Sequence, residues 1–269
     1  MSDKGFERIA VIGAGIMGEA LIAALISYGV KPASICISEK RSERSDELVT
    51  RYGVAAADLS VNVASADALL LVVKPQDMAN ALNEIAGKVN QGALIISFAA
   101  GKTIDFIAEH LAGKNPIIRV MPNTPTLVGE GMAGISSNSY VTSREKSFVL
   151  GFLGATGSVV EVPEELQNAV TATSGSGPAY FFRFVEAMIA AAIELGLSQD
   201  VATKLTIQTI VGSAKLLETS GKSATTLREN VTSPNGTTAA ALAEFNAADI
   251  DAIVKKAMSA AHKRAIELA

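Results

Sequence analysis

Three glycines near the N-terminus have a spacing that suits a phosphate-binding turn. The run Gly13-Ala14-Gly15-Ile16-Met17-Gly18 follows an apolar stretch, Ile9 to Ile12, and precedes a segment rich in Ala, Leu and Ile. We expect Gly13 to permit a tight turn, Gly15 to let the backbone approach a pyrophosphate, and Gly18 to let the helix pack on the strand. Free N–H groups and the positive dipole end of the helix would face that phosphate. The pattern predicts a dinucleotide-binding strand, turn and helix, and a glycine-rich turn kept only for packing is the alternative.

The end of the second predicted strand bears on which dinucleotide is bound. This strand, Ser34 to Ser38, is followed by Glu39-Lys40-Arg41. At this place an acidic side chain bonds the 2′-hydroxyl of NAD, whereas Arg or Lys binds the 2′-phosphate of NADP. Two adjacent cations and a hydroxyl suit a dianionic phosphate better than one carboxylate suits a diol, so we favour NADP, with Ser38, Lys40 and Arg41 as its contacts. NAD remains open, as does a solvated helix N-terminus without any ligand.

Three further apolar runs predict parallel strands that are buried on both faces. They are Ala68 to Val73, Leu94 to Phe98 and Ile117 to Val120. In open α/β sheets ligands lie outside the carboxyl ends of the strands, so the loops after these runs should meet at the edge that holds the glycine turn. The cofactor contacts expected from these loops are Val73, Lys74, Pro75, Ala99, Ala100, Met121, Pro122 and Asn123.

The pattern changes after a last predicted strand, Gly157 to Val162. From Pro163 onward the periodicity is helical and alanine-rich, which predicts a doubly wound parallel α/β domain at 1–162 and an all-α domain at 163–269. The predicted helix from Pro178 to Leu195 is apolar nearly all round, and a helix that is apolar on all sides is buried on all sides. We therefore expect it to pack against a second subunit.

The composition excludes several classes of protein. A chain of 269 residues, 49% hydrophobic and 19% charged, with a formal charge of −4, is typical of a globular protein and not of a nucleic-acid binder. No apolar run approaches the roughly 20 residues that span a bilayer, and no signal-peptide pattern is present, so we expect a cytoplasmic protein without a membrane partner. The lone Cys36 excludes a disulfide framework and a cysteine-based metal site, and we expect no metal.

Four segments beyond the glycine turn carry a more specific pattern. They are Val73-Lys74-Pro75-Gln76, Arg119 to Pro125, Ser174-Gly175-Ser176-Gly177-Pro178-Ala179-Tyr180 and Val231 to Thr238. With the glycine turn, these segments resemble the pyrroline-5-carboxylate reductase family over essentially the whole chain. The resemblance implies a Rossmann domain followed by a helical dimerisation domain. It also implies that 1-pyrroline-5-carboxylate is reduced to L-proline with NADPH or NADH, the last step of proline biosynthesis, in a homodimer. Whether such dimers assemble into a decamer stays open.

The resemblance places the substrate at two hydroxyl-rich bends. Ser233 to Thr238 opens a predicted helix, Thr237 to Phe245, and offers hydroxyl and N–H groups to a small carboxylate. Ser174 to Pro178 is expected to be a second turn ahead of a helix, on the opposite wall. The substrate contacts implied are Ser174, Gly175, Ser176, Gly177, Ser233, Asn235, Gly236, Thr237 and Thr238. Thr238 matches the catalytic threonine whose hydroxyl faces the ring nitrogen.

Two departures from the family pattern affect these assignments. Asn235 stands where the family usually has glycine, and asparagine tolerates a positive φ better than other residues with a side chain. The segment between Val54 and Asp67 looks short for the family, so the asparagine often found beside the adenosine ribose is not assigned to Asn62.

The chemistry that the resemblance implies needs little acid or base. Hydride attack on a protonated imine carbon cancels a charge that the substrate already carries, and neither bend contains His, Lys, Asp or Glu. A β-hydroxyacid dehydrogenase has the same N-terminal glycine motif. Such an enzyme needs a lysine to accept or donate the alcohol proton, and this chain has Phe181 at the position of that lysine. A non-catalytic NADP-binding sensor is a further alternative, which the intact bend Ser233 to Thr238 disfavours.

Overall fold

The computed structural model describes residues 6–268. Tertiary contacts divide the chain into two compact units. The sheet unit runs to Ser176 and resumes at Ala261, and the helical unit comprises Gly177–Ala260. Among the residues described, no helix is long and apolar enough to cross a membrane.

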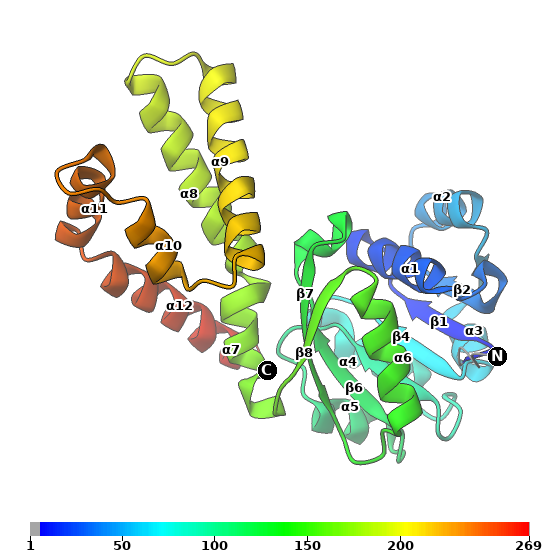
Figure 1. Ribbon diagram of the computed structural model, residues 1–269. Coiled ribbons are helices and arrows are strands. Elements are labelled where there is room, and N and C mark those ends of the chain that lie inside the picture. Colours follow the sequence, from blue (N-terminus) through cyan, green and yellow to red (C-terminus); the bar gives the residue numbers. More distant parts are fainter. Residues whose placement is uncertain (1–5, 269) are drawn as a thin grey trace. The chain divides into compact units, whose positions relative to one another are not determined.

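The sheet unit is built on one sheet with the order β3-β2-β1-β4-β5-β6-β7-β8 (Figure 1). Strands β1 to β6 run parallel to one another, β7 is antiparallel to β6, and β8 is parallel to β7. The strands are β1 Ile9–Ile12, β2 Ile35–Ser38, β3 Ala55–Ala56, β4 Ala68–Leu71, β5 Leu94–Ser97, β6 Ile117–Met121, β7 Gly131–Ser137 and β8 Gly157–Glu161. The six parallel strands therefore end at one edge, and the predicted doubly wound α/β fold is confirmed.

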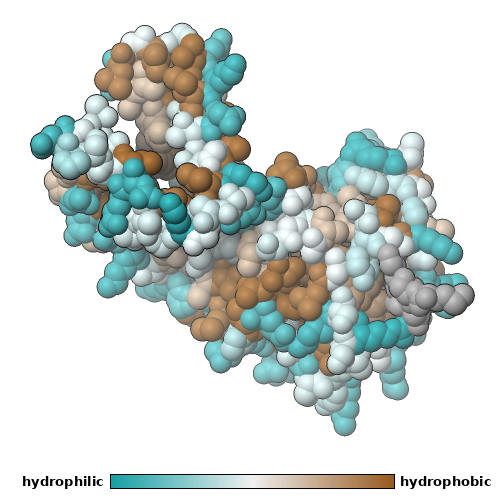
Figure 2. Space-filling view, in the orientation of Figure 1, coloured by the Kyte–Doolittle hydropathy of each residue, from teal (hydrophilic) through white to brown (hydrophobic). Residues whose placement is uncertain are grey.

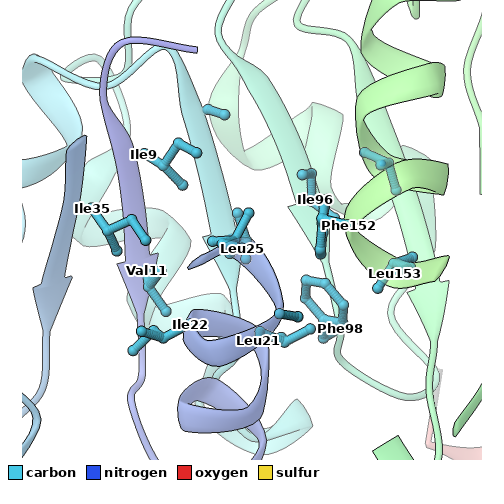
Figure 3. Packing of buried hydrophobic residues seen from close by; sticks show 14 of the residues in the cluster. Ile9, Val11, Leu21, Ile22, Leu25, Ile35, Ile96, Phe98, Phe152 and Leu153 are labelled. Carbon is cyan, nitrogen blue, oxygen red and sulfur yellow. The ribbon is translucent and has the colours of Figure 1, made fainter. Parts of the chain in front are cut away.

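Helices cover both faces of the sheet (Figure 1). They are α1 Ile16–Tyr28, α2 Ser42–Tyr52, α3 Leu59–Ala64, α4 Met78–Ile85, α5 Ile104–Leu111 and α6 Ser143–Gly154, with short turns at η1 Pro32–Ser34, η2 Pro75–Asp77 and η3 Thr124–Val128. Because strand side chains alternate, Val11 of β1 packs with α1 and α6 while Ala10 packs with α4 and α5. Figure 3 shows the first cluster, in which Leu21, Ile22 and Leu25 of α1 gather with sheet residues and with Phe152 of α6. Two apolar layers thus hold the strand ends in place.

Strands β3 and β7 were not predicted from the sequence. β3 has only two residues, Ala55 and Ala56. β7 reads Gly-Met-Ala-Gly-Ile-Ser-Ser, a composition with little intrinsic strand preference. Its small residues have a tertiary reason, because a Cβ at Gly134 would lie 2.7 Å from the Val170 side chain. Pairing with β6 and β8, rather than local propensity, decides that this segment is a strand.

The last strand, β8, ends at Glu161, and the sheet unit continues past the domain boundary predicted at residues 162 and 163. After η4 Glu164–Leu166 come the short helix α7 Gln167–Val170 and the π-helical segment η5 Thr171–Gly175. The buried Gln167 donates from Nε2 to the Gly134 carbonyl and the Ser136 hydroxyl of β7, at 3.2 and 2.9 Å. These contacts keep the segment before Ser176 packed on the sheet.

The chain from Gly177 onward is helical and exposes much apolar surface. Its helices are α8 Gly177–Glu194, α9 Gln199–Thr219, α10 Ala224–Asn230, α11 Thr237–Ala247 and α12 Ile250–Glu267. Helices α8 and α9 lie side by side (Figure 1), and Figure 2 shows hydrophobic residues on the surface around them. Large exposed side chains on the pair are Phe181, Phe182, Phe184, Met188, Ile193, Val201, Leu205, Ile207, Val211, Leu216 and Leu217. A single chain therefore leaves uncovered the face that was predicted to meet a second subunit.

Candidate functional site

The glycine turn between β1 and α1 has the geometry expected of it. Gly13 has a φ of +86°, and a Cβ there would lie 2.8 Å from the Val72 carbonyl oxygen. A Cβ at Gly18 would meet the carbonyl oxygen of Gly13, so both positions require glycine. A Cβ at Gly15 would meet nothing within 4 Å. The open space over Gly15 is what close approach of a pyrophosphate requires, and this cradle fits a dinucleotide.

The N-terminus of α1 is available to an anion. Gly15 is its N-cap residue and supplies no side-chain hydrogen bond to the first turn. The first N–H groups of a helix have no partner within the helix, and the dipole adds positive potential at this end. The turn Gly13 to Gly18 can therefore bind a phosphate through its backbone.

The peptide groups of Ala14 are held on both sides by the segment after β2. Its N–H donates to Oε2 of Glu39 at 3.0 Å, and its carbonyl accepts from Nε of Arg44 at 3.2 Å. The other oxygen of Glu39 accepts from the Arg41 backbone N–H at 3.2 Å and from Arg41 Nε at 2.9 Å. Glu39, which was weighed as a ribose acceptor, is thus bound to the glycine turn and to Arg41.

The electrostatics keep Glu39 ionised. Burial raises its pKa, but the hydrogen bonds from the Arg41 side chain and from the N–H groups of Arg41 and Ala14 outweigh this effect. The pKa of Glu39 is therefore below its ordinary value. A fixed negative charge lies at the end of β2, beside two exposed cations, Lys40 and Arg41.

The hydroxyl of Ser38 is already engaged within the protein. It donates to the Ala57 carbonyl at 2.9 Å and accepts from Nδ2 of Asn62, also at 2.9 Å. Asn62 is buried and donates in addition to the Cys36 carbonyl at 3.0 Å. Asn62 was left unassigned because the segment between Val54 and Asp67 looks short for the family. The structure places it beside β2, where its side chain donates to Ser38 and Cys36.

A charged network joins α2 to α1 behind the turn, and sequence reasoning did not find it. Arg44 pairs with Glu19 and with Glu47, Arg51 pairs with the same two carboxylates, and Tyr52 donates its hydroxyl to Glu19 at 3.0 Å. A signal was present in the spacing of Arg44, Glu47 and Arg51, which places the three on one helix face. The network holds Arg44 against the Ala14 carbonyl.

The loops after β4, β5 and β6 meet at the edge of the glycine turn, as predicted. The Val72 N–H donates to the Ile12 carbonyl at 2.8 Å, and the Phe98 N–H donates to the Leu71 carbonyl at 3.0 Å. Ala99 and Pro122 are buried there, and Lys74 is exposed. Asn123 accepts from the Met132 N–H at 2.8 Å, which fixes its side chain against β7. The predicted contacts Val73 to Pro75, Ala99, Ala100 and Met121 to Asn123 therefore line one edge.

The segment Ser174 to Pro178 was predicted to be a turn ahead of a helix, and helix α8 does follow it from Gly177. The turn itself is wrong, because Ser174 and Gly175 belong to a π-helical segment and only Ser176 forms a bend. The chain continues from α7 through the π-helical segment, in which the Ser176 N–H donates to the Thr171 carbonyl at 2.8 Å. Ser174 donates its hydroxyl to the Val170 carbonyl at 3.2 Å. A Cβ at Gly175 would collide with the side chain of Met121, the last residue of β6. This π-helical segment therefore lies against the predicted cofactor edge, and π-helical insertions are frequent at functional sites.

The bend Ser233 to Gly236 does open a helix, as predicted. Asn235 adopts a φ of +58°, which confirms that it takes the conformation expected of a glycine. The Gly236 N–H donates to the Ser233 carbonyl at 3.0 Å, and Gly236 is the N-cap of α11 without a side-chain cap. Thr237 is exposed and Thr238 is half-buried in the first turn. The bend presents hydroxyls and uncapped N–H groups that fit a small carboxylate.

Two family models match the chain. One, described as pyrroline-5-carboxylate reductase dimerisation, matches residues 164–268. The other, described as NADP oxidoreductase coenzyme F420-dependent, matches residues 8–101. The oxidoreductase model thus matches the strand-rich part of the sequence, and the dimerisation model matches the helical part.

Individual relatives match the whole chain. The pyrroline-5-carboxylate reductase of Corynebacterium melassecola is 39% identical over 264 residues, which cover 97% of this chain and 98% of the relative. The solved pyrroline-5-carboxylate reductase of Coxiella burnetii superposes with a TM-score of 0.90 at 33% identity, covering 98% of this chain and 99% of that one. The Plasmodium falciparum pyrroline carboxylate reductase, solved with NADP bound, gives a TM-score of 0.87 at 29% identity with the same coverage.

Proposed function

Because the chain belongs to the pyrroline-5-carboxylate reductase family, we infer that it reduces 1-pyrroline-5-carboxylate to L-proline with NADPH, the last step of proline biosynthesis. The observation that carries this inference is the presence of two glycine-preceded helix N-termini without side-chain caps, at α1 and at α11. One suits the pyrophosphate of a dinucleotide, and the other suits the carboxylate of a small acid.

The cofactor is held by the edge of the sheet unit. When bound, NADPH supplies the hydride. The turn Gly13, Ala14, Gly15, Ile16, Met17 and Gly18 would hold the pyrophosphate. The N–H groups at the start of α1 would face it, because those of Gly13 and Ala14 already donate to Ser38 and Glu39. Ser38, Lys40 and Arg41 would face the adenosine ribose and its phosphate. The residues after β4, β5 and β6 would close the slot around the nicotinamide. The small or buried side chains Ala99, Ala100 and Pro122 would exclude water from that slot.

The substrate is held by hydroxyl and backbone groups. Ser233, Asn235, Gly236, Thr237 and Thr238 would bind its carboxylate, and the segment Ser174 to Gly177 would contact the ring. The Thr238 hydroxyl, beside the ring nitrogen, would orient the imine. A threonine hydroxyl is no strong acid at neutral pH, so the imine enters protonated and hydride addition at carbon neutralises its charge.

The chain forms a homo-oligomer, in keeping with its dimerisation domain. We propose a homodimer built on the apolar surfaces of α8 and α9, and a decamer assembled from such dimers. We also propose domains at 1–162 and 163–269, because the dimerisation family model begins at residue 164, even though residues up to Ser176 pack with the sheet unit. We further propose a cytoplasmic location.

A steady-state assay tests the function directly. Purified protein should oxidise NADPH when 1-pyrroline-5-carboxylate is added, and L-proline should accumulate in equal amount. A hydroxyacid offered with NADP⁺ should give no reduction, because no lysine stands at the position of Phe181. NADPH that stays unoxidised with the imine would overturn the proposal and leave a cofactor-binding sensor.

A further inference from the structure

The end of β2 carries a carboxylate in contact with the glycine turn. The Gly13 N–H donates to the Ser38 carbonyl at 2.9 Å, so the residue after Ser38 lies directly beside the turn. Glu39 occupies that place, its side chain is only 9% exposed, and Ala14 and Arg41 both donate to it. In dinucleotide-binding sheets this is where the ribose of the adenosine is recognised.

The carboxylate offsets the charge of the nearest cation. Arg41 is 65% exposed, and its Nε lies 2.9 Å from Oε1 of Glu39. Arg44 is tied to Glu19, Glu47 and the Ala14 carbonyl. A 2′-phosphate arriving beside Arg41 therefore meets a fixed like charge, and the lowered pKa of Glu39 keeps that charge in place at neutral pH.

The same carboxylate has room for a hydroxyl. A carboxylate offers about four acceptor sites over its two oxygens. Oε1 accepts both bonds from Arg41, whereas Oε2 accepts the one from Ala14. A ribose 2′-hydroxyl can thus donate to Oε2 without displacing a protein partner.

We propose that Glu39 is a specificity-determining residue that limits the preference of this chain for NADPH over NADH, because its carboxylate repels the 2′-phosphate, offsets Arg41 and accepts a 2′-hydroxyl. The proposal rests on the proposed function, since it assumes that a dinucleotide occupies the glycine turn. The competing account is that Glu39 only holds the turn through the Ala14 N–H.

Binding of cofactor fragments separates these accounts. Calorimetric titrations with ADP-ribose and 2′-phospho-ADP-ribose report on the adenosine end alone and need no turnover. Glu39→Gln should raise the affinity for 2′-phospho-ADP-ribose relative to ADP-ribose by about tenfold, since it removes a like charge near the phosphate. Glu43→Gln, the same change at an exposed position of α2, should alter the ratio by less than about twofold. A ratio in Glu39→Gln within about twofold of wild type overturns the proposal.

A second variant decides the question if Glu39→Gln does not fold. Glu39→Asp keeps the charge but withdraws it from Ala14, so the ratio should stay within about twofold of wild type. A tenfold shift toward the phosphorylated probe in Glu39→Asp would mean that charge is not the cause, which overturns the proposal. If neither probe binds wild-type protein, the dinucleotide site itself fails and this proposal fails with it. If both probes bind wild-type protein and Glu39→Gln does not change the ratio of their affinities, the dinucleotide site of the proposed function stands and the role proposed for Glu39 is wrong.

Discussion

The sheet unit and the helical unit differ in how they use their apolar residues. In the sheet unit two layers of buried side chains enclose the strands, and Phe152, Leu21 and Leu69 are fully buried. In the helical unit Phe181 is 62% exposed and Phe182 is 61% exposed. A helix with this much apolar surface is stable only when that surface is covered. One unit completes its core within the chain, and the other needs a second chain.

The two turns that we propose bind anions show the same difference. Side chains from another element hold the turn before α1, where Glu39 and Arg44 bind the N–H and the carbonyl of Ala14. The turn before α11 is shaped by its own residues, through the positive φ of Asn235 and the bond from Gly236 to Ser233. The first turn depends on tertiary structure and the second on local sequence.

The largest expected effect is on the core of the sheet unit. Phe152→Ala should lower the free energy of unfolding by about 3–5 kcal/mol, because it leaves a cavity among fully buried side chains. Denaturant unfolding followed by circular dichroism measures this, and the loss should not depend on protein concentration. Leu150→Ala on the same helix, 37% exposed, is the control and should cost well under half as much. Equal losses would contradict a core confined to one face of α6.

Next in size is an effect on turnover from the helical unit. Thr238→Ala should lower kcat about a hundredfold, since the imine loses the hydroxyl that orients it, while NADPH affinity stays near normal. Steady-state kinetics and cofactor titration together measure this. Thr209→Ala, an exposed threonine of α9, is the matched control and should be silent. A parallel loss of turnover and cofactor affinity would refute the role given to Thr238.

A smaller effect is expected on assembly. Phe181→Ala should weaken the free energy of self-association by about 1–2 kcal/mol, because the apolar ring is no longer there to be buried when two subunits associate. Sedimentation equilibrium over a range of protein concentrations measures the change. Tyr140→Ala, 50% exposed on the sheet unit, should leave association unaltered. If the two variants behaved alike, the apolar surface of α8 would not be the subunit contact.

The smallest effect sharpens the cofactor assignment. Arg41→Glu should weaken NADPH relative to NADH by about fivefold to tenfold, since a cation that faces the 2′-phosphate becomes an anion. Fluorescence titration of both cofactors measures the ratio. Arg183→Glu, the same reversal on α8, is the control. An unchanged ratio would remove Arg41 from the phosphate site.

Much of the fold follows from local pattern. The apolar runs predicted β1, β4, β5 and β6 because a parallel strand buried on both faces has no polar face to interrupt the run. The glycine spacing predicted the turn before α1. Asn235 took its positive φ because that preference belongs to the residue itself.

Other features depend on residues that are distant in the chain. β7 exists because it pairs with β6 and β8, and Gly175 is required because Met121 lies against it. The turn expected at Ser174 to Pro178 begins instead as a π-helical segment that ends at Gly175, because α7 is already packed on β7 and the helix continues from it.

By itself the sequence determined where the long apolar strands and the glycine turns begin, β3 and β7 excepted, since these depend on periodicity and on the φ that each residue tolerates. Only the tertiary structure decided the partners of the polar side chains around those turns. From the sequence, the Glu39 side chain could have bound a ribose or a protein group, and the Asn62 side chain could have bound any of several neighbours. Their partners, Ala14 and Ser38, are fixed by strand pairing, which brings together groups that no local pattern relates.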